Sequence, residues 1–187
     1  MAIRSVNYEY KKVSSNSRAD IKNNNIVTLE QQICNTFKKS YISKADTKKI
    51  IESLPKINWN KYEEVNGEDG FELIRWIYEL NIEDEEDIIN MIKASKSLDA
   101  AYSELLAEKL KNMFLQNEIK FVEALSKVPD YTEEIGEELA FACMDKDKFN
   151  EDIENLIQSH KLSNVQKKVI KNMKTAFNNF IKRNINS

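Results

Sequence analysis

Glycine and proline are scarce in this chain, and their scarcity constrains the fold more than any other sequence feature. The 187 residues include 3 glycines and 2 prolines. Turn-rich β-folds and glycine-rich phosphate loops need both residue types repeatedly, so the composition predicts an all-α fold. The length allows one sizeable core without disulfides or a metal. Cys34 and Cys143 have no CxxC spacing and are predicted to be buried free thiols.

Helix-start residues followed by apolar residues at helical spacing predict about nine helices. Thr28 with Gln31 and Ser163 with Gln166 have the spacing of capping boxes. Two prolines, at 55 and 129, mark helix ends. Segment 57–65 is predicted to be a short helix or turn. The expected helices are 29–42, 46–54, 71–80, 84–95, 98–115, 118–128, 131–144, 147–159 and 163–183, with Asp46, Asn117 and Asp147 as further caps.

The chain divides into a tail and one helical domain. Residues 1–26 are rich in Ser, Asn and Lys and lack a helical apolar period, so they are predicted to form a flexible polar tail. Residues 27–187 are predicted to form a single all-α domain. No apolar run has the length of a membrane span or the position of a signal peptide. A soluble cytoplasmic protein is expected, or a secreted protein or lipoprotein if a leader was removed.

One segment of the chain occurs a second time in similar form. Residues 49–57 resemble residues 120–128, 71 positions later, and each copy follows a capping residue. Similar pieces start at Ile88 and Asp152, so the four are about 32 to 38 residues apart. Over Thr28 to Arg183 the chain resembles the broad class of HEAT-like and TPR-like helical-repeat proteins. That resemblance implies antiparallel hairpins stacked into a short irregular α-solenoid, and a compact helical bundle is the alternative.

The chain contains no recognisable catalytic or metal-binding motif. His160, the single histidine, lacks the partner spacing of HExxH and is interpreted as a surface or C-cap residue. The string that begins at Asp145 starts like a calcium loop, but Phe149 and Leu156 replace required oxygen ligands. We interpret that string as a helix start. Phosphate loops and nucleophile elbows are also absent, so no catalytic residue, cofactor or metal ligand is nominated, and a non-enzymatic protein is favoured.

Charge is unevenly distributed along the chain. Residues 1–61 hold 12 Lys/Arg and 5 Asp/Glu, residues 62–160 hold 9 and 26, and residues 161–187 hold 7 and none. An acidic surface of this kind steers association with a basic partner. Trp59 and Trp76, on either side of the glycine loop, could anchor a partner or fill the core. The candidate partner-binding residues are therefore Glu83, Asp84, Glu85, Glu86, Asp87, Glu133, Glu134, Glu137, Glu138, Trp59 and Trp76.

The leading hypothesis is a non-enzymatic protein-interaction module that binds a protein partner, for example a basic one, through an acidic face or groove. One version is an immunity-type protein that neutralises a nucleic-acid-degrading partner. A second hypothesis is contact with nucleic acid or an anionic membrane through the basic C-terminal helix, although its charges could instead offset the acidic middle. A third is a helical enzyme or ligand carrier with dispersed carboxylates and aromatics. The sequence does not decide the oligomeric state, and it shows no small-molecule substrate.

Overall fold

The structure, a computed structural model, describes residues 27–66, 70–97, 100–142 and 144–185 and confirms the all-α prediction. This part of the chain contains ten α-helices, three 3-10 turns and no strand. None of its helices is long and apolar enough to cross a membrane. The helices are α1 (Leu29–Phe37), α2 (Lys44–Ser53), α3 (Trp59–Asn66), α4 (Gly70–Glu79), α5 (Glu85–Ala94), α6 (Ala100–Gln116), α7 (Glu118–Lys127), α8 (Thr132–Phe141), α9 (Lys146–Ser159) and α10 (Asn164–Ile185); the 3-10 turns are η1 (Leu54–Lys56), η2 (Ser95–Ser97) and η3 (Pro129–Tyr131).

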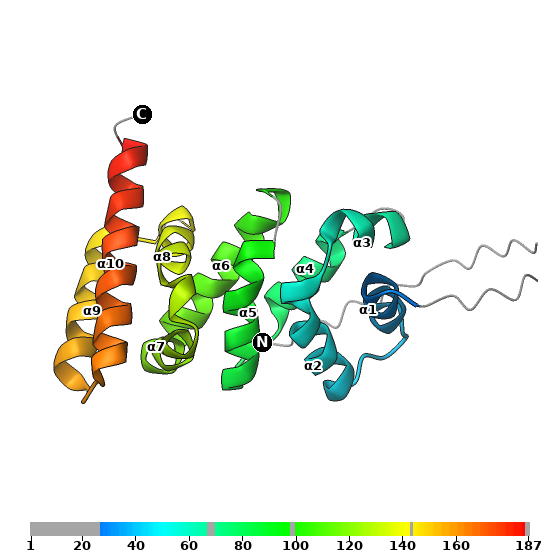
Figure 1. The fold of residues 1–187 in the computed structure, drawn as a ribbon, viewed down its shortest axis with the longest axis horizontal. Helices are drawn as coiled ribbons and strands as arrows, with labels where there is room; N and C mark the ends of the chain where they lie inside the picture. The colour runs from blue at the N-terminus through cyan, green and yellow to red at the C-terminus, as the bar shows by residue number, and fades with distance from the viewer. Residues whose placement is uncertain (1–26, 67–69, 98–99, 143, 186–187) are drawn as a thin grey trace, which may run out of the picture.

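The helices follow one another along the long axis, from α1 at one end to α9 and α10 at the other (Figure 1). They pack in two rows that both end on α10. One row is α2, α5, α7 and α10, and the other is α1, α3, α4, α6, α8 and α10. Helices α2, α5 and α7 contain three of the four similar sequence segments, and each is followed by a 3-10 turn. The internal repeat and the solenoid stay predictions.

Side-chain caps determine where several helices begin, because they accept hydrogen bonds from the otherwise unpaired backbone N–H groups of the first turn. The predicted caps Thr28 and Asn117 accept from the backbone N–H groups three residues on, and Ser163 forms its capping box with Gln166. Two predicted caps were wrong. Ser43 caps α2, with Asp46 at the third helical position, and the cap of α9 is Asp145, two residues before Asp147.

Helical spacing predicts buried faces that include Tyr41, Phe71 and Tyr78, but these three aromatic residues are exposed. The first helix ends at Phe37 rather than at residue 42, so Tyr41 lies beyond it and is 77% exposed. In α4 the buried face consists of Gly70, Leu73, Ile74 and Ile77. Phe71 and Tyr78 lie beside that face and are 39% and 36% exposed. Helical spacing identifies a face, but the neighbouring helices decide how wide its buried part is.

One continuous apolar core runs through the described residues, from Ile33 in α1 to Phe177 in α10. Its centre at the α9–α10 end is aromatic. Phe149 stacks on Phe177 with the ring centroids 4.1 Å apart, and Phe114 lies 5.8 Å from Phe149. Cys34 is a buried free thiol, as predicted, and donates to Asn66 Oδ1. Cys143, the tail 1–26 and loop residues 67–69 lie outside the described residues.

Helices α8 and α10 approach each other more closely than a side chain would allow, at Gly136. A Cβ atom added there would lie 2.5 Å from the backbone oxygen of Met173 and 2.8 Å from Cβ of Ala176. The α8–α10 pair has the most extensive helix–helix contact among the described elements. A glycine is therefore required at position 136 for this packing. The close approach also sets the geometry of the groove described below.

Lys109 of α6 is a buried cation that closes the end of another helix. The residue is 6% exposed, and its ammonium group donates to the backbone oxygens of Tyr78 and Leu80 at the C-terminal end of α4. Helix ends leave carbonyl groups without partners and carry partial negative charge, so a cation there is stabilising. Burial lowers the pKa of Lys109. We interpret this lysine as a structural cap rather than a catalytic group.

Candidate functional site

The predicted acidic run lies at the start of α5, where each carboxylate has a different environment. Asp84 caps the helix by accepting from the backbone N–H of Glu86 at 3.0 Å. Glu83 accepts from Asn81 at 2.7 Å. Glu85 forms an ion pair with Lys127 of α7. Negative charge is favourable here because the helix start carries partial positive charge, so part of this run serves the fold.

Two further carboxylates lie on the helices that pack against α5. Glu52 of α2 raises the pKa of Asp87, after burial and Asp84. The hydrogen bond with Glu85 raises the pKa of Lys127 of α7, and Glu123, one helical turn earlier on the same helix, adds to the shift. Both added residues are exposed. We define the acidic surface as Glu52, Asp84, Glu85, Glu86, Asp87 and Glu123, on helices α2, α5 and α7, with Lys48 and Lys127 among them.

Asp87 is the carboxylate of the acidic surface whose surroundings disfavour its charged form. Its Oδ1 is buried and has no hydrogen-bond partner among the described residues. Burial raises its pKa, and Asp84, Glu52 and Glu86 add to the shift, while Lys48 opposes it. A buried carboxylate oxygen without a donor is unfavourable by about 1–3 kcal/mol. A cation placed next to Asp87 would offset the repulsion from its acidic neighbours.

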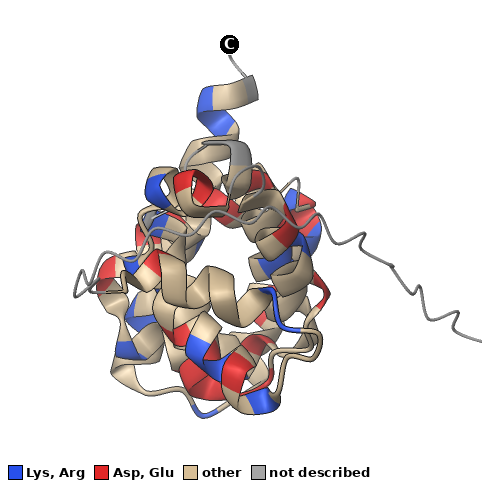
Figure 2. Cartoon of the chain, turned by 90° about the vertical axis from the view of Figure 1, so that its right-hand side faces the viewer, with Lys and Arg blue, Asp and Glu red and all other residues tan. Residues whose placement is uncertain are grey.

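The other predicted acidic group lies on α8, in the second row of helices. Glu134 pairs with Lys96 at 3.8 Å, and Glu137 pairs with Arg183 of α10 at 2.6 Å. Glu133 is exposed, and Glu138 is half-buried. The structure therefore assigns the two predicted acidic groups to different rows. Viewed along the long axis, acidic and basic residues intermingle around the outside of the molecule (Figure 2).

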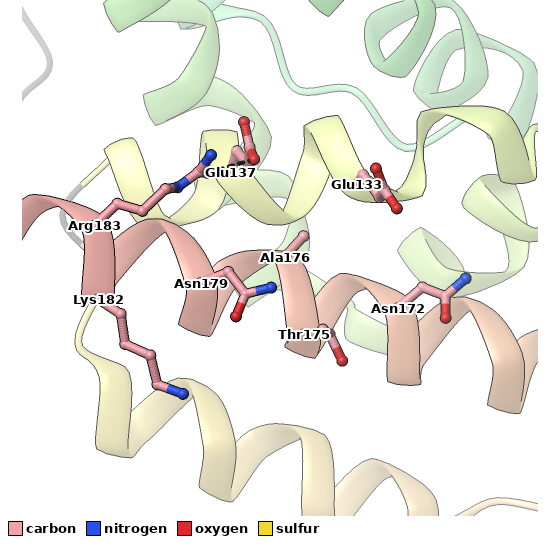
Figure 3. Close-up of a pocket in the computed structure, with 8 residues that line it drawn as sticks. All are labelled: Glu133, Glu137, Asn172, Thr175, Ala176, Asn179, Lys182 and Arg183. Carbon is pink, nitrogen blue, oxygen red and sulfur yellow. Dashed lines mark hydrogen bonds and ion pairs between the residues drawn. The ribbon is translucent and has the colours of Figure 1, made fainter.

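A polar groove of about 480 Å³ runs between α8 and α10 (Figure 3). Glu133 and Glu137 rise from α8 one helical turn apart, so they lie on the same wall rather than facing each other. An acid and a base on opposite sides of a substrate therefore cannot be assigned to this pair. Sequence reasoning missed the α10 wall because its asparagines carry no motif. The lining residues are Glu133, Glu137, Asn172, Thr175, Ala176, Asn179, Lys182 and Arg183.

The two candidate tryptophans differ in their access to a partner. Trp59 is 4% exposed and packs against Tyr62 and Tyr102, with ring centroids 6.0 and 5.2 Å apart. It belongs to the core, so in this structure its ring is not available to a partner. Trp76 is half-buried and meets Phe37 of α1 edge-on at 5.6 Å. We therefore leave both out of the acidic surface.

His160 and the calcium-like string that begins at Asp145 both lie at helix ends. His160 is the C-cap of α9, as predicted, and its Nδ1 lies 2.8 Å from the hydroxyl oxygen of Ser159. The calcium-like string is a helix start, since Asp145 accepts from the backbone N–H of Lys148. Phe149, in the supposed ligand position, is fully buried. Across the ranges that the structure describes, no group of three or more His, Cys, Asp or Glu residues could hold a metal ion.

Glu138 provides a pH-dependent prediction. Burial, together with the charges of Glu134 and Glu137, raises its pKa from 4.5 to about 7. Between these values the folded state binds more protons than the unfolded state, so stability falls as pH rises from about 4.5 to about 7 and the penalty is complete above that. We expect Glu138→Gln to stabilise the protein by about 1 kcal/mol at pH 8, after allowance for solvent screening, and by almost nothing at pH 4.

Urea unfolding of the wild type and Glu138→Gln between pH 4 and pH 8 measures this difference. The exposed neighbour Glu133, changed to Gln, is the matched control and should leave stability within about 0.5 kcal/mol at every pH. A stabilisation by Glu138→Gln that is equally large at pH 4 and pH 8 would contradict the raised pKa.

Comparisons of this chain with protein-family models, with curated proteins and with solved structures found no match.

Proposed function

We propose that this chain is a non-enzymatic protein-interaction module that binds a basic protein partner through the acidic surface. The observation that carries this proposal is the concentration of carboxylates on α5 and on the two helices that pack against it. Glu52 of α2 acts on Asp87, and Lys127 of α7, one helical turn after Glu123, pairs with Glu85. Because α5 packs against both α2 and α7, these side chains keep a defined arrangement of charge. Such an arrangement favours partners of complementary charge and speeds their association.

The environment of Asp87 supports a cationic partner in particular. Its buried Oδ1 lacks a donor among the described residues. A lysine or arginine that a partner places beside Asp87 would oppose the repulsion from Asp84, Glu52 and Glu86 and lower the pKa of Asp87. Surface ion pairs contribute little individually, so affinity would come from several carboxylates acting together with apolar contacts around them. A partner that binds nucleic acid through a basic site is one candidate within this proposal.

The test compares two variants of equal net charge. Glu86→Lys with Glu123→Lys reverses two exposed residues of the acidic surface, and Glu64→Lys with Glu104→Lys reverses two exposed residues of the other row. Binding of a fluorescein-labelled ten-residue polylysine peptide is measured by anisotropy at low and high salt. We expect the acidic-surface variant to bind at least tenfold more weakly, the other variant to change less than threefold, and high salt to weaken wild-type binding.

Equal losses for the two variants would mean that the peptide senses net charge, and the proposal would be wrong. The same three proteins then serve as baits in lysate. Proteins retained by the wild type and the Glu64/Glu104 variant, but lost from the Glu86/Glu123 variant, identify a partner of the acidic surface.

Exposed lysines of α10 favour a second candidate function, which is binding of nucleic acid or an anionic membrane surface through this helix. Lys174 and Arg183 pair with Glu154 and Glu137. The remaining lysines at the start of this helix are exposed, and no acidic residue occupies its first turn. If this function is correct, charge reversal of the exposed cluster Lys167, Lys168 and Lys171 should abolish salt-dependent binding to labelled DNA or anionic vesicles. Unchanged binding after the reversal would exclude it.

A further inference from the structure

The α10 wall of the groove between α8 and α10 carries unused hydrogen-bonding groups. Asn172 and Asn179 are exposed, and their amides have no partner among the described residues, unlike Asn178, whose amide donates to the backbone oxygen of Lys174. Asparagine is also a poorer helix former than alanine. The two amides therefore weaken the helix slightly without contributing an internal bond. Thr175, between them, donates its hydroxyl proton to Lys171 and keeps its oxygen available to accept.

The spacing of the two amides matches an extended polypeptide. Asn172 and Asn179 are seven residues apart and lie on the same side of α10, so their Cα atoms are separated by about 10 Å. Three residues of an extended chain span about the same length. An asparagine amide offers one acceptor and two donors, so it can pair with both the N–H and the C=O of a peptide group. Two such amides could hold an extended backbone at two points.

The two ends of the groove differ in the charge of their side chains. Glu133 lies on the α8 wall at the same end as Asn172, and Lys182 and Arg183 lie at the opposite end, beyond Asn179 (Figure 3). Arg183 is held by its ion pair with Glu137. A bound segment is therefore favoured when its basic residue lies near Glu133 and its acidic residue or terminal carboxylate lies near Lys182.

We propose that the groove between α8 and α10 binds an extended peptide segment of a partner protein, with Asn172 and Asn179 pairing with its backbone and its charges ordered from basic, near Glu133, to acidic, near Lys182. This site is separate from the acidic surface and does not depend on the function proposed for it. Backbone pairing sets the chemical class of the ligand, and the two charged ends select among sequences.

The test uses two defined probes, both six-residue peptides with a fluorescein label on a flexible linker. The first has lysine near its N-terminus, threonine and valine in the middle, and aspartate at a free C-terminus. The second has the same composition with the lysine and aspartate exchanged and an amidated C-terminus. Both peptides are titrated against the full chain, and against Asn172→Ala with Asn179→Ala. Alanine favours the helix, so this double variant is expected to fold.

We expect at least one peptide to bind, the two peptides to differ at least threefold in affinity, and the double variant to weaken binding about tenfold or more. Asn155→Ala, at an exposed position of α9 outside the groove, is the matched control and should change affinity less than twofold. The Glu86/Glu123 variant should bind the peptide with wild-type affinity. This measurement therefore distinguishes a failure of the peptide-binding proposal from a failure of the function proposed for the acidic surface.

Three results would overturn the proposal. The first is absence of binding by both peptides up to about 1 mM. The second is equal affinity for the wild type and the Asn172/Asn179 variant. The third is a short single-stranded RNA that binds in the groove, with the same loss in the double variant, since the site would then recognise nucleic acid rather than peptide.

Discussion

Phe149→Ala is expected to lower the free energy of unfolding by about 4 kcal/mol. The Phe149 ring is fully buried, stacks on Phe177 at 4.1 Å and lies close to Phe114. Its removal takes away buried apolar surface and leaves a cavity that three helices cannot close without moving. The loss is a large fraction of the 5–15 kcal/mol that stabilises a typical protein. Urea unfolding followed by circular dichroism measures the change.

Two further variants separate cavity formation from simple loss of a phenylalanine. Phe149→Leu retains most of the volume and is expected to cost only about 1.5 kcal/mol. Phe141 is 45% exposed and meets Phe180 at its edge, with ring centroids 6.5 Å apart, so Phe141→Ala should cost about 1 kcal/mol. If Phe149→Ala and Phe141→Ala were equally destabilising, the aromatic centre described for the α9–α10 end would be wrong.

Gly136→Val is expected to lower the free energy of unfolding by about 3 kcal/mol and the midpoint of thermal unfolding by about 10 °C. Even a Cβ atom at position 136 would lie 2.5 Å from a backbone oxygen of α10. The two branches of valine enlarge the clash, so α8 and α10 must move apart along their most extensive contact. Because the same two helices form the walls of the groove, peptide binding should weaken in this variant as well.

A double variant tests whether the clash is the cause. Gly136→Ala with Ala176→Gly removes the contact with Cβ of Ala176 but keeps the contact with the Met173 backbone oxygen. We therefore expect Ala176→Gly to rescue Gly136→Ala only in part. Glu133→Ala, at an exposed position of the same helix, should change stability by less than about 0.5 kcal/mol. Full stability of Gly136→Val would contradict the close approach of the two helices.

Local sequence signals predicted most of the helices because those signals act within a few residues. Ser163 and Gln166 form their capping box within one turn of α10, and Thr28 caps α1 by accepting from the backbone N–H of Gln31. Errors arose where two candidates for the same role stood close together. Asp46 is a plausible cap from its residue type, but Ser43 comes first and leaves Asp46 to accept from the backbone N–H of Ser43.

The candidate site was only partly predictable. The acidic run at the start of α5 stands out because its members are adjacent, but Glu52 and Glu123 contribute through the packing of α2 and α7 on α5. No spacing in the sequence indicates that α2 and α7 pack against α5. Asn172 and Asn179 form a groove wall only because α8 lies beside α10. Trp59 was predicted to be a site residue because tryptophan is suited to an interface, but its neighbours bury it in the structure.

The sequence alone determined the all-α class and most helix starts, since composition, capping and apolar period are local properties of the chain. The tertiary structure alone decided which carboxylates share a surface, which aromatics are buried and where two helices leave a polar groove. These features depend on contacts between residues distant in the chain, such as Gly136 with Met173. Local patterns specify the face that a helix buries, but packing specifies which other helix covers that face.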